Sequence, residues 1–408
     1  MHVVLFGDQH LESLGGAQVS MRLQRKYLER AGHTVSVVAP ELHGHRAAER
    51  RRSGAVDPSY LDLPSFPITA DREYAMTWPG RRTDRILDRA LASRPPVDLV
   101  HVQADFWGAF IGHRFAHRHG VPAVHTMHNR VDVGIQAVTP MHRPVLTALN
   151  AWRRSALRGI GDQPSGRDGW SYLRGVAAES RAVTAPSGHF ARRLEEHGVF
   201  PSVDVVWNGI DDEVLSEVLA AVPAAREPGP PRLVWLGRMS PEKRLLPFLE
   251  AVVASDVEAE VEIVGGGAQR KAAERIAARA GRPRIRFLGR LSYPEVLARM
   301  AAADAVVQTS IGFETQGMTP FEAATLGTPT IVSDPDIAGE LRGGQWTVPE
   351  GGADERTRVA ALARTLRVAV ADIAAGAAPT PDPEVATQFR QSSRTAAMIA
   401  VYERVLGS

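Results

Sequence analysis

The feature that most constrains this chain is an order of strand, glycine loop, helix and strand that occurs in both halves of the sequence. In the first half, the apolar run 2–6 leads through a polar loop to Gly15-Gly16, a segment with helical apolar spacing and a second apolar run, 34–40. The second half repeats this order around a glycine-led loop, with the runs 232–236 and 260–264. Strands that alternate with helices form a parallel sheet covered by helices. The sequence therefore predicts an α/β protein with two doubly wound, Rossmann-like domains.

The length of 408 residues also favours two domains over one. The segment 220–231 is rich in Ala and Pro and has the composition of a linker. We therefore expect an N-terminal domain at residues 1–222, a C-terminal domain at residues 230–384 and a final helix at residues 385–408. The region 41–80 is rich in Pro, Arg and His and predicts a long loop or ragged strands, a kind of segment that often carries function.

Charge and composition limit the classes of partner. The net charge of +2 is too small to predict a nucleic-acid-binding protein, and the absence of cysteine excludes disulfides and thiol catalysis. We expect a cytoplasmic protein, since we see no signal peptide and no apolar stretch of the ~20 residues that a membrane span needs. The basic residues of the first half form clusters that could meet anionic lipid or phosphate, although a solvated arginine-rich surface explains any single cluster. These clusters are Arg46, Arg50–Arg52, Arg81-Arg82-Arg85-Arg89, Arg114/Arg118 and Arg153-Arg154-Arg158.

The stretch 308–332 combines acidic residues with a helix start. It follows a short apolar run and predicts a helix over 321–326. Glu314 lies on the loop between strand and helix, where a carboxylate can accept hydrogen bonds from a polyhydroxylated ligand, and we favour a functional role for it. Glu322 has two interpretations: it binds a ligand, or it completes a capping box that begins at Thr319.

The loop after the strand 232–236 carries Arg238 and Lys243 before a helix start. Basic residues there oppose the helix dipole, which favours an anionic ligand such as a diphosphate. His128 ends a predicted strand, where open sheets bind ligands, but a lone histidine is usually structural. Asp334-Pro335-Asp336 matches a metal-binding motif superficially, and we interpret it as a turn. We therefore predict no metal and no cofactor.

Taken together, the motifs resemble those of family 4 glycosyltransferases, which have the GT-B fold, with two Rossmann-like domains that face a central cleft. The resemblance covers essentially the whole chain. It rests on Gly15-Gly16, Pro186-Ser187, 208–211, 237–243, 264–267 and the pair Glu314 and Glu322, followed by Ala323, Gly327 and Pro329. It implies a retaining transferase that uses a nucleotide-activated sugar, and a final helix that crosses back to the first domain.

The resemblance also implies roles for individual residues. Arg238 and Lys243 would stabilise the leaving diphosphate, Glu314 would hold the sugar, Glu322 would bind the ribose, and His128 would contact the sugar near the reacting carbon. These catalytic residues are His128, Arg238, Lys243 and Glu314. The donor-binding residues are Gly15, Gly16, Gly237, Gly265, Leu288, Gln316, Gly317, Met318, Thr319 and Glu322.

A narrower resemblance links residues 314–319 and 125–128 to the branch that glucosylates diacylglycerol. It favours UDP-glucose as donor and a membrane lipid as hydroxyl acceptor, reached by peripheral contact through the basic N-terminal domain. The chain departs from that branch in regions 41–82 and 161–169, where acceptors usually bind. The alternatives are a GDP-mannose-dependent mannosyltransferase with a lipid or small-molecule acceptor, a sugar-nucleotide epimerase of the same fold, and an inactive nucleotide-sugar-binding protein.

Overall fold

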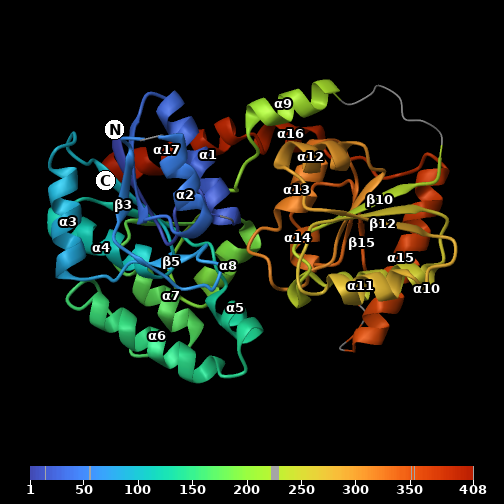
Figure 1. Ribbon diagram of the computed structural model, residues 1–408, viewed down its shortest axis with the longest axis horizontal. Helices are drawn as coiled ribbons and strands as arrows, with labels where there is room; N and C mark the ends of the chain where they lie inside the picture. Colours follow the sequence, from blue (N-terminus) through green and yellow to red (C-terminus); the bar gives the residue numbers. More distant parts are fainter. Residues whose placement is uncertain (14, 55–56, 222–228, 351, 353, 408) are drawn as a thin grey trace. The chain divides into compact units, whose positions relative to one another are not determined.

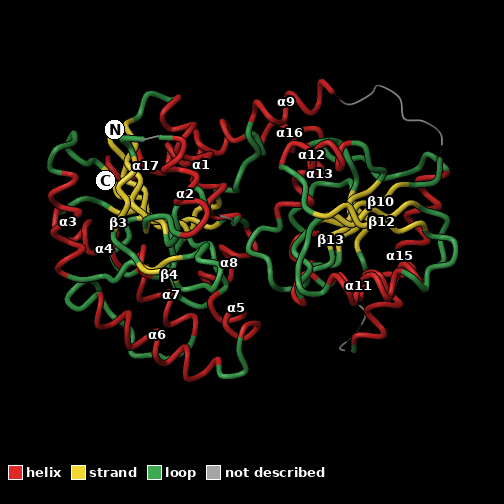
Figure 2. Tube along the Cα trace, in the orientation of Figure 1, coloured by secondary structure: helices red, strands yellow, loops and turns green. Residues whose placement is uncertain are grey.

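The computed structural model describes residues 1–13, 15–54, 57–221, 229–350, 352 and 354–407. The chain divides into two compact units (Figure 1). The first contains Met1–Gly209 and Arg394–Ser408, and the second contains Ile210–Ser393. In each unit a central sheet lies among helices (Figure 2). The two α/β domains with parallel sheets that the sequence predicts are therefore confirmed.

The first unit has a seven-stranded sheet in which all neighbouring strands are parallel. In sheet order the strands are β3 (Tyr60–Leu63), β2 (Thr34–Pro40), β1 (His2–Gly7), β6 (Leu99–Gln103), β7 (Ala123–Thr126), β8 (Ala182–Ala185) and β9 (Val203–Val205). The helices are α1 (Gly16–Arg30), α2 (Gly44–Ser53), α3 (Arg81–Leu91), α4 (Trp107–His119), α5 (Val131–Val138), α6 (His142–Ala156), α7 (Gly169–Ala177), α8 (Gly188–Glu196) and α17 (Gln391–Gly407). A small antiparallel hairpin joins β4 (Phe66–Pro67) to β5 (Ala75–Met76).

The second unit has a six-stranded parallel sheet. In sheet order the strands are β12 (Arg284–Gly289), β11 (Glu260–Val264), β10 (Arg232–Leu236), β13 (Ala305–Gln308), β14 (Thr330–Val332) and β15 (Gln345–Thr347). The helices are α9 (Asp212–Ala221), α10 (Leu245–Ser255), α11 (Arg270–Ala277), α12 (Tyr293–Ala301), α13 (Met318–Thr325), α14 (Pro335–Ala338), α15 (Glu355–Ala374) and α16 (Pro383–Gln388). A short 3-10 turn, η1 (Pro241–Lys243), precedes α10.

The strands read as continuous apolar runs because helices cover both faces of each sheet. In β1, every residue is buried. Phe6 packs in a cluster with Phe110 of α4, whereas its neighbour Leu5 packs in another cluster with Tyr402 of α17. Successive side chains of a strand point to opposite faces, so one run supplies the core on both sides of the sheet.

Several elements agree with the sequence, and others do not. The strands expected at 34–40, 232–236 and 260–264 are present with those bounds. The region 41–80 contains the short strands β3, β4 and β5, which agrees with the alternative of ragged strands, and it also contains the helix α2, which was not predicted. The long helix α15 was not anticipated, because its alternation of Ala, Arg and Val gives a weak apolar pattern.

The contacts of the chain place the change of unit after Gly209, whereas the sequence placed the end of the first domain at residue 222. The difference is α9, whose Leu215 and Val218 pack in a cluster with Leu297 and Met300 of α12. Much of the expected linker, residues 222–228, lies outside the described residues. The residues of α17 from Arg394 onward belong to the first unit.

No helix of the described chain is both long enough and apolar enough to cross a bilayer.

Candidate functional site

The order of strands in the second unit locates the first part of the site. From β10 the chain moves outward to β11 and β12 and then returns to β13 on the other side of β10. Loops on the two sides of such a switch point diverge, and ligands bind there, at the carboxyl ends of the strands. The loops that follow β10 and β13 carry Arg238, Lys243 and Glu314, so the fold brings together three of the four predicted catalytic residues.

Lys243 and Glu314 form an ion pair in which the ammonium group donates a hydrogen bond to Oε1 of the carboxylate. The hydroxyl of Ser310 donates to the same oxygen at 2.8 Å. The side chains are partly exposed, at 27% for Lys243 and 15% for Glu314. The pair is therefore accessible to a ligand.

The backbone of Lys243 is also held in place. Its carbonyl accepts a hydrogen bond from the Thr309 hydroxyl at 2.7 Å, and that hydroxyl accepts one from Nε1 of the buried Trp235 at 2.8 Å. Thr309 follows β13 directly and Trp235 lies in β10. The two strands at the switch point thus fix the position of the cation.

Arg238 stands further into solvent, with 69% of its side chain exposed. It lies 3.3 Å from Glu242, which also accepts a hydrogen bond from Ser240. Burial alone would raise the pKa of Glu242, but the Ser240 hydroxyl and the charges of Arg238 and Lys243 hold it below its ordinary value. The loop therefore presents Arg238 and Lys243 with one ionised carboxylate between them.

Glycines let neighbouring loops approach closely beside these cations. Gly265 has a φ of +127°, and a Cβ there would lie 1.9 Å from the Gly237 carbonyl oxygen. Its N–H donates to the Gly289 carbonyl at 2.7 Å, and the Gly237 N–H donates to the Val264 carbonyl at 3.1 Å. Any side chain at Gly265 would therefore separate the loops. Leu288, another predicted donor-binding residue, lies near the end of β12.

The predicted segment 316–319 forms the start of α13. Gly317 is the N-cap with a φ of +73°, and a Cβ there would lie 2.6 Å from Cδ1 of Ile337. Gln316 is buried, while Met318 and Thr319 are partly buried. The first turn of a helix offers backbone N–H groups without intrahelical partners, which suits an oxygen-rich ligand.

The capping-box interpretation of Glu322 is wrong. The helix begins at Met318, earlier than predicted, and its N-cap residue is Gly317, with no side-chain capping bond. Glu322 instead accepts a hydrogen bond from the Tyr293 hydroxyl of α12 at 2.8 Å and is 7% exposed. Burial raises the pKa of its carboxyl group, and the bond from Tyr293 opposes this rise.

The motif Asp334-Pro335-Asp336 caps a helix. The Asp334 carboxylate accepts hydrogen bonds from the N–H groups of Asp336 at 2.9 Å and Gly312 at 2.7 Å, and it is buried. It is the N-cap of α14, so its oxygens are already used by the backbone. Within the described ranges, no cluster of three or more His, Cys, Asp or Glu side chains has a geometry that could hold a metal ion.

The remaining predicted residues, Gly15, Gly16 and His128, belong to the first unit. Gly15 precedes α1, which begins at Gly16. His128 follows β7 and is partly buried, and burial lowers its pKa to about 4. The imidazole is therefore neutral at physiological pH, so it would act through hydrogen bonding rather than through charge.

Two acidic residues that were not predicted lie at strand ends of the first unit. Asp105 accepts hydrogen bonds from Nδ2 of Asn129 at 2.5 Å and from the backbone N–H of His128 at 3.3 Å. Asp8 accepts from the backbone N–H groups of Asp105 and Gly108, both at 2.8 Å. Burial raises the pKa of Asp8 to about 6, and burial together with the charge of Asp8 raises that of Asp105 to about 7. Their position directly after apolar runs was the signal that could have found them.

Models of two protein families match the chain. The model of glycosyltransferase family 4 matches residues 14–214, and that of the glycosyl transferases group 1 matches residues 222–343. The two matches follow one another along the chain and together cover the strands described above except β1 and β15.

Relatives with known activities have low sequence identity to this chain, but they align with most of its length. The chain is 23% identical over 349 residues to the alpha-monoglucosyldiacylglycerol synthase of Streptococcus pneumoniae, which covers 81% of this chain and 70% of that protein. It is 24% identical over 344 residues to the GDP-mannose-dependent alpha-mannosyltransferase of Mycolicibacterium smegmatis, covering 82% of this chain and 80% of that protein.

Solved structures of similar fold span the whole chain. HepE of Anabaena, in complex with UDP, superposes with a TM-score of 0.63 at 16% identity, covering 99% of this chain and 100% of that one. The sucrose-phosphate synthase of Thermosynechococcus elongatus has a TM-score of 0.67 at 16% identity, covering 100% and 99%. The solved structures thus agree with the GT-B fold, and the two family models show that the chain belongs to the family 4 glycosyltransferases.

Proposed function

We propose that this glycosyltransferase is a retaining hexosyltransferase that moves glucose from UDP-glucose to the hydroxyl group of a membrane lipid. The observation that carries the transferase chemistry is the Lys243–Glu314 pair at the switch point of the second sheet, beside the exposed Arg238. Departure of a nucleoside diphosphate develops negative charge, and fixed cations stabilise such charge most effectively when they are already in place. The hydrogen bond from Thr309 to the Lys243 carbonyl supplies that preorganisation.

In this proposal each residue has a separate task. Arg238 and Lys243 stabilise the leaving diphosphate, and Glu314 accepts hydrogen bonds from sugar hydroxyls. Glu322, which lies in the middle of α13, binds the ribose. The backbone of 316–319 and the glycine loops at Gly237 and Gly265 line the donor, with Leu288 beside them. His128, as a neutral imidazole, contacts the sugar near the reacting carbon, and Gly15-Gly16 approaches the phosphates.

The proposed substitution takes place on one face of the sugar. The bond from the anomeric carbon to the diphosphate oxygen breaks, the acceptor oxygen bonds to the same face, and the acceptor proton passes to the leaving phosphate. Glu314 does not suit the role of nucleophile, because one of its oxygens already accepts hydrogen bonds from Lys243 and Ser310. The reaction requires no metal, since Arg238 and Lys243 supply the positive charge.

The choice of donor and acceptor rests on the names of the relatives. A relative named as a monoglucosyldiacylglycerol synthase favours glucose and a lipid, and HepE was solved with UDP. The competing candidate is a GDP-mannose-dependent transfer to a lipid or small molecule, which the names of two mannosyltransferase relatives favour.

A membrane acceptor needs a surface that can approach lipid. The basic clusters of the first unit are less available than the sequence suggested. Arg153 is fully buried, and Arg46 and Arg114 pair with Glu73 and Asp84. On α3, by contrast, four arginines are exposed, namely Arg81, Arg82, Arg85 and Arg89.

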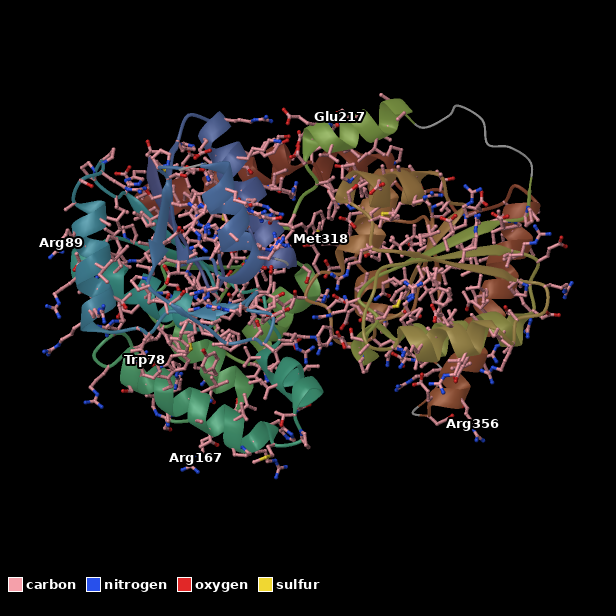
Figure 3. The ribbon with its side chains drawn as sticks, in the orientation of Figure 1. Trp78, Arg89, Arg167, Glu217, Met318 and Arg356 are labelled. Atoms are coloured by element: carbon pink, nitrogen blue, oxygen red, sulfur yellow. The ribbon has the colours of Figure 1, made fainter. Side chains whose placement is uncertain are left out.

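Exposed apolar side chains accompany these arginines. Trp78 is 61% exposed, and Phe66 of the β4–β5 hairpin is 46% exposed. Both line one groove together with Arg81 and Arg82, and Figure 3 labels Trp78 at the surface of this unit. Tryptophan and arginine side by side are typical of surfaces that lie in the headgroup region of a bilayer. We call this set the α3 surface.

A donor screen tests the proposal. The purified protein is incubated with UDP-glucose, UDP-galactose, UDP-N-acetylglucosamine and GDP-mannose, with and without diacylglycerol vesicles, and products are separated by chromatography. Glucosylated lipid with the α-linkage, formed from UDP-glucose, supports the proposal. Transfer from GDP-mannose would replace the donor assignment. A new sugar-nucleotide without acceptor would indicate an epimerase, and binding without turnover would indicate an inactive binding protein.

A further inference from the structure

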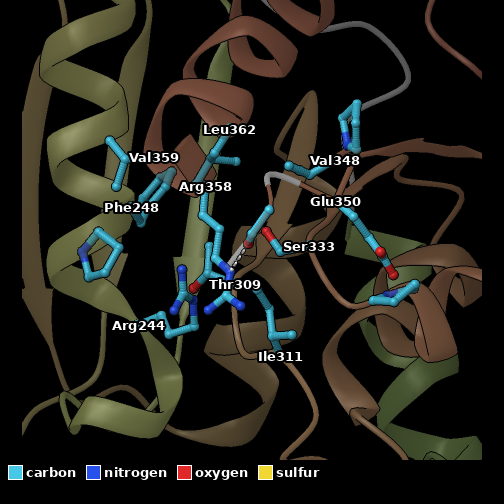
Figure 4. Close-up of a pocket in the computed structure, with 14 residues that line it drawn as sticks. Arg244, Phe248, Thr309, Ile311, Ser333, Val348, Glu350, Arg358, Val359 and Leu362 are labelled. Atoms are coloured by element: carbon cyan, nitrogen blue, oxygen red, sulfur yellow. Dashed lines mark hydrogen bonds between the residues drawn. The ribbon is translucent and has the colours of Figure 1, made fainter. Parts of the chain in front are cut away.

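A cavity of about 350 Å³ lies in the second unit, on the other side of β13 from the glycine loops. It opens at the carboxyl ends of β13, β14 and β15 and is closed by the first turns of α10 and α15 (Figure 4). Its volume falls within the range of sites for small ligands. None of the predicted donor-binding or catalytic residues lines it.

The walls of the cavity are apolar and its rim is charged. Phe248 of α10 and Leu362 of α15 are buried in the core and face the cavity together with Val359. Arg244 and Arg358 also line it, and Figure 4 shows both side chains reaching the same side, with Glu350 across the opening. A ligand with an apolar body and an anionic group at one end would match the apolar walls and the two arginines of the rim.

The two arginines differ in their partners. Arg244 forms a two-pronged ion pair with Glu355, at 3.0 and 2.9 Å. Arg358 donates to the Gly352 carbonyl at 3.1 Å, and no carboxylate of the described chain lies within ion-pair distance of it. The guanidinium of Arg358 is therefore partly buried near another cation and has no carboxylate partner in the described chain. Binding of an anion to such a guanidinium is favourable, because it supplies the missing counter-charge.

We propose that this cavity is a second binding site, for an organic phosphate or carboxylate whose anionic group is held by Arg244 and Arg358 and whose apolar body packs on Phe248, Val359 and Leu362. The site is additional to the donor site of the proposed function. It takes a ligand with an apolar ring and one anionic group, because most of its walls are apolar and the two arginines lie at its rim.

The cavity is connected to the catalytic lysine through the chain itself. Arg244 has a φ of +56°, a left-handed conformation that is uncommon for residues other than glycine. Because of this conformation, the side chains of the neighbouring residues 243 and 244 point in different directions. Lys243 pairs with Glu314, whereas Arg244 faces the cavity. Thr309 lines the cavity and also donates to the Lys243 carbonyl. A ligand that contacts Arg244 and Thr309 therefore acts one residue from the donor site.

Phenyl phosphate is the probe that matches this chemistry, and calorimetric titration measures its binding to the full-length protein. We expect saturable binding, with inorganic phosphate and benzyl alcohol each binding more weakly. Arg358→Gln should weaken the binding by about tenfold, the usual cost of losing a charged hydrogen bond. The matched control is Arg356→Gln, on the same helix but exposed to solvent (Figure 3), and it should have no effect.

A second control separates this cavity from the donor site. Arg238→Ala should leave phenyl phosphate binding unchanged, because Arg238 does not line the cavity. Absence of saturable binding below about 10 mM, which corresponds to less than about 3 kcal/mol, would overturn the proposal. Equal losses in the Arg356 and Arg358 variants, or a loss only in the Arg238 variant, would also overturn it.

The link to Lys243 has its own readout. Phenyl phosphate should change the affinity for UDP by at least about threefold, and UDP should change the affinity for phenyl phosphate by the same factor, because coupling between sites is reciprocal. Unchanged affinities would overturn the coupling. If UDP does not bind while phenyl phosphate does, the donor assignment of the proposed function fails and the cavity site stands.

Discussion

Lys243 donates a hydrogen bond to Glu314 although 71 positions separate the two residues in the chain. The contact exists because the turn after β10 and the loop after β13 follow neighbouring parallel strands. It places a cation and a carboxylate at the edge of the sheet where the fold binds ligands. The pair is therefore the first target for mutation.

Lys243→Ala and Arg238→Ala should each lower the turnover number by at least about 100-fold, the low end of the cost of losing one electrostatic stabiliser of a transition state. Initial rates with the donor found in the screen measure this. The control is Lys271→Ala, because Lys271 is an exposed lysine on α11 of the same unit. Near-normal rates in both site variants would refute the assignment of these cations to the diphosphate.

Glu322→Gln should separate binding from stability. Burial raises the pKa of the Glu322 carboxyl group, so its ionised form opposes folding above that pKa, and the neutral glutamine removes this cost. We expect a melting temperature at pH 7.5 that is no lower than that of the wild type, and an affinity for UDP that is about tenfold weaker. Glu274→Gln, on the exposed face of α11, is the control. A lower melting temperature with unchanged affinity would assign Glu322 a structural role.

The case of Glu322 shows where sequence reasoning succeeds and where it stops. The alternation of apolar runs and helices was sufficient for both sheets, because runs buried on both faces have few other solutions. The start of α13 was predicted three residues late, because Gly317 caps the helix through its left-handed backbone, which no side-chain pattern reports. The Tyr293 hydroxyl that contacts Glu322 comes from α12, and contacts between helices depend on packing that the sequence does not specify.

Other wrong or absent predictions also concern contacts between elements that lie far apart in the sequence. The arginines of α4 appeared as a basic surface, but Arg114 and Arg118 pair with Asp84 and Asp88 of α3. Asp105 was not predicted as a site residue, because a single aspartate after a strand is common. Its significance is visible only when β1 and β6 are adjacent and Asp8 approaches it.

Asp105→Asn should shift the dependence of stability on pH in one direction. Between about pH 4 and about pH 7, the free energy of unfolding of the variant should fall less, or rise more, than that of the wild type. Burial and the charge of Asp8 raise the pKa of Asp105 from 3.8 to about 7. Between these two values the folded protein binds a proton at Asp105 that the unfolded chain releases, so the contribution of Asp105 to the free energy of unfolding falls as pH rises from about 4 to about 7. The free energy of unfolding is measured by urea denaturation at two pH values inside this window and at one above it, which gives its slope against pH. Asp162→Asn, at an exposed position, should keep the wild-type slope. Equal slopes in all three proteins would contradict the prediction.

Catalysis should persist in the presence of EDTA. In the proposed function Arg238 and Lys243 are the counter-charges of the leaving phosphate, and the buried oxygens of Asp334 already accept backbone N–H groups. Asp336→Asn should likewise keep its activity, because the backbone N–H of Asp336, not its side chain, makes the capping bond to Asp334. Complete loss of activity on chelation, restored by Mg²⁺ or Mn²⁺, would show that a metal ion is required and would reopen the role of this motif.

The α3 surface should bind anionic vesicles at low salt. Each arginine near an anionic leaflet contributes about 1 kcal/mol, and the attraction fades within a Debye length. Replacing Arg81 and Arg82 with glutamine should therefore weaken sedimentation with vesicles by about tenfold or more, and Trp78→Ala should weaken it at every salt concentration. Arg192→Gln, at an exposed position of α8, is the control. Neutral vesicles should capture little protein. If the wild type ignores anionic vesicles at low salt, the acceptor is a molecule in solution, and the transferase assignment, which rests on Lys243 and Glu314, is unaffected.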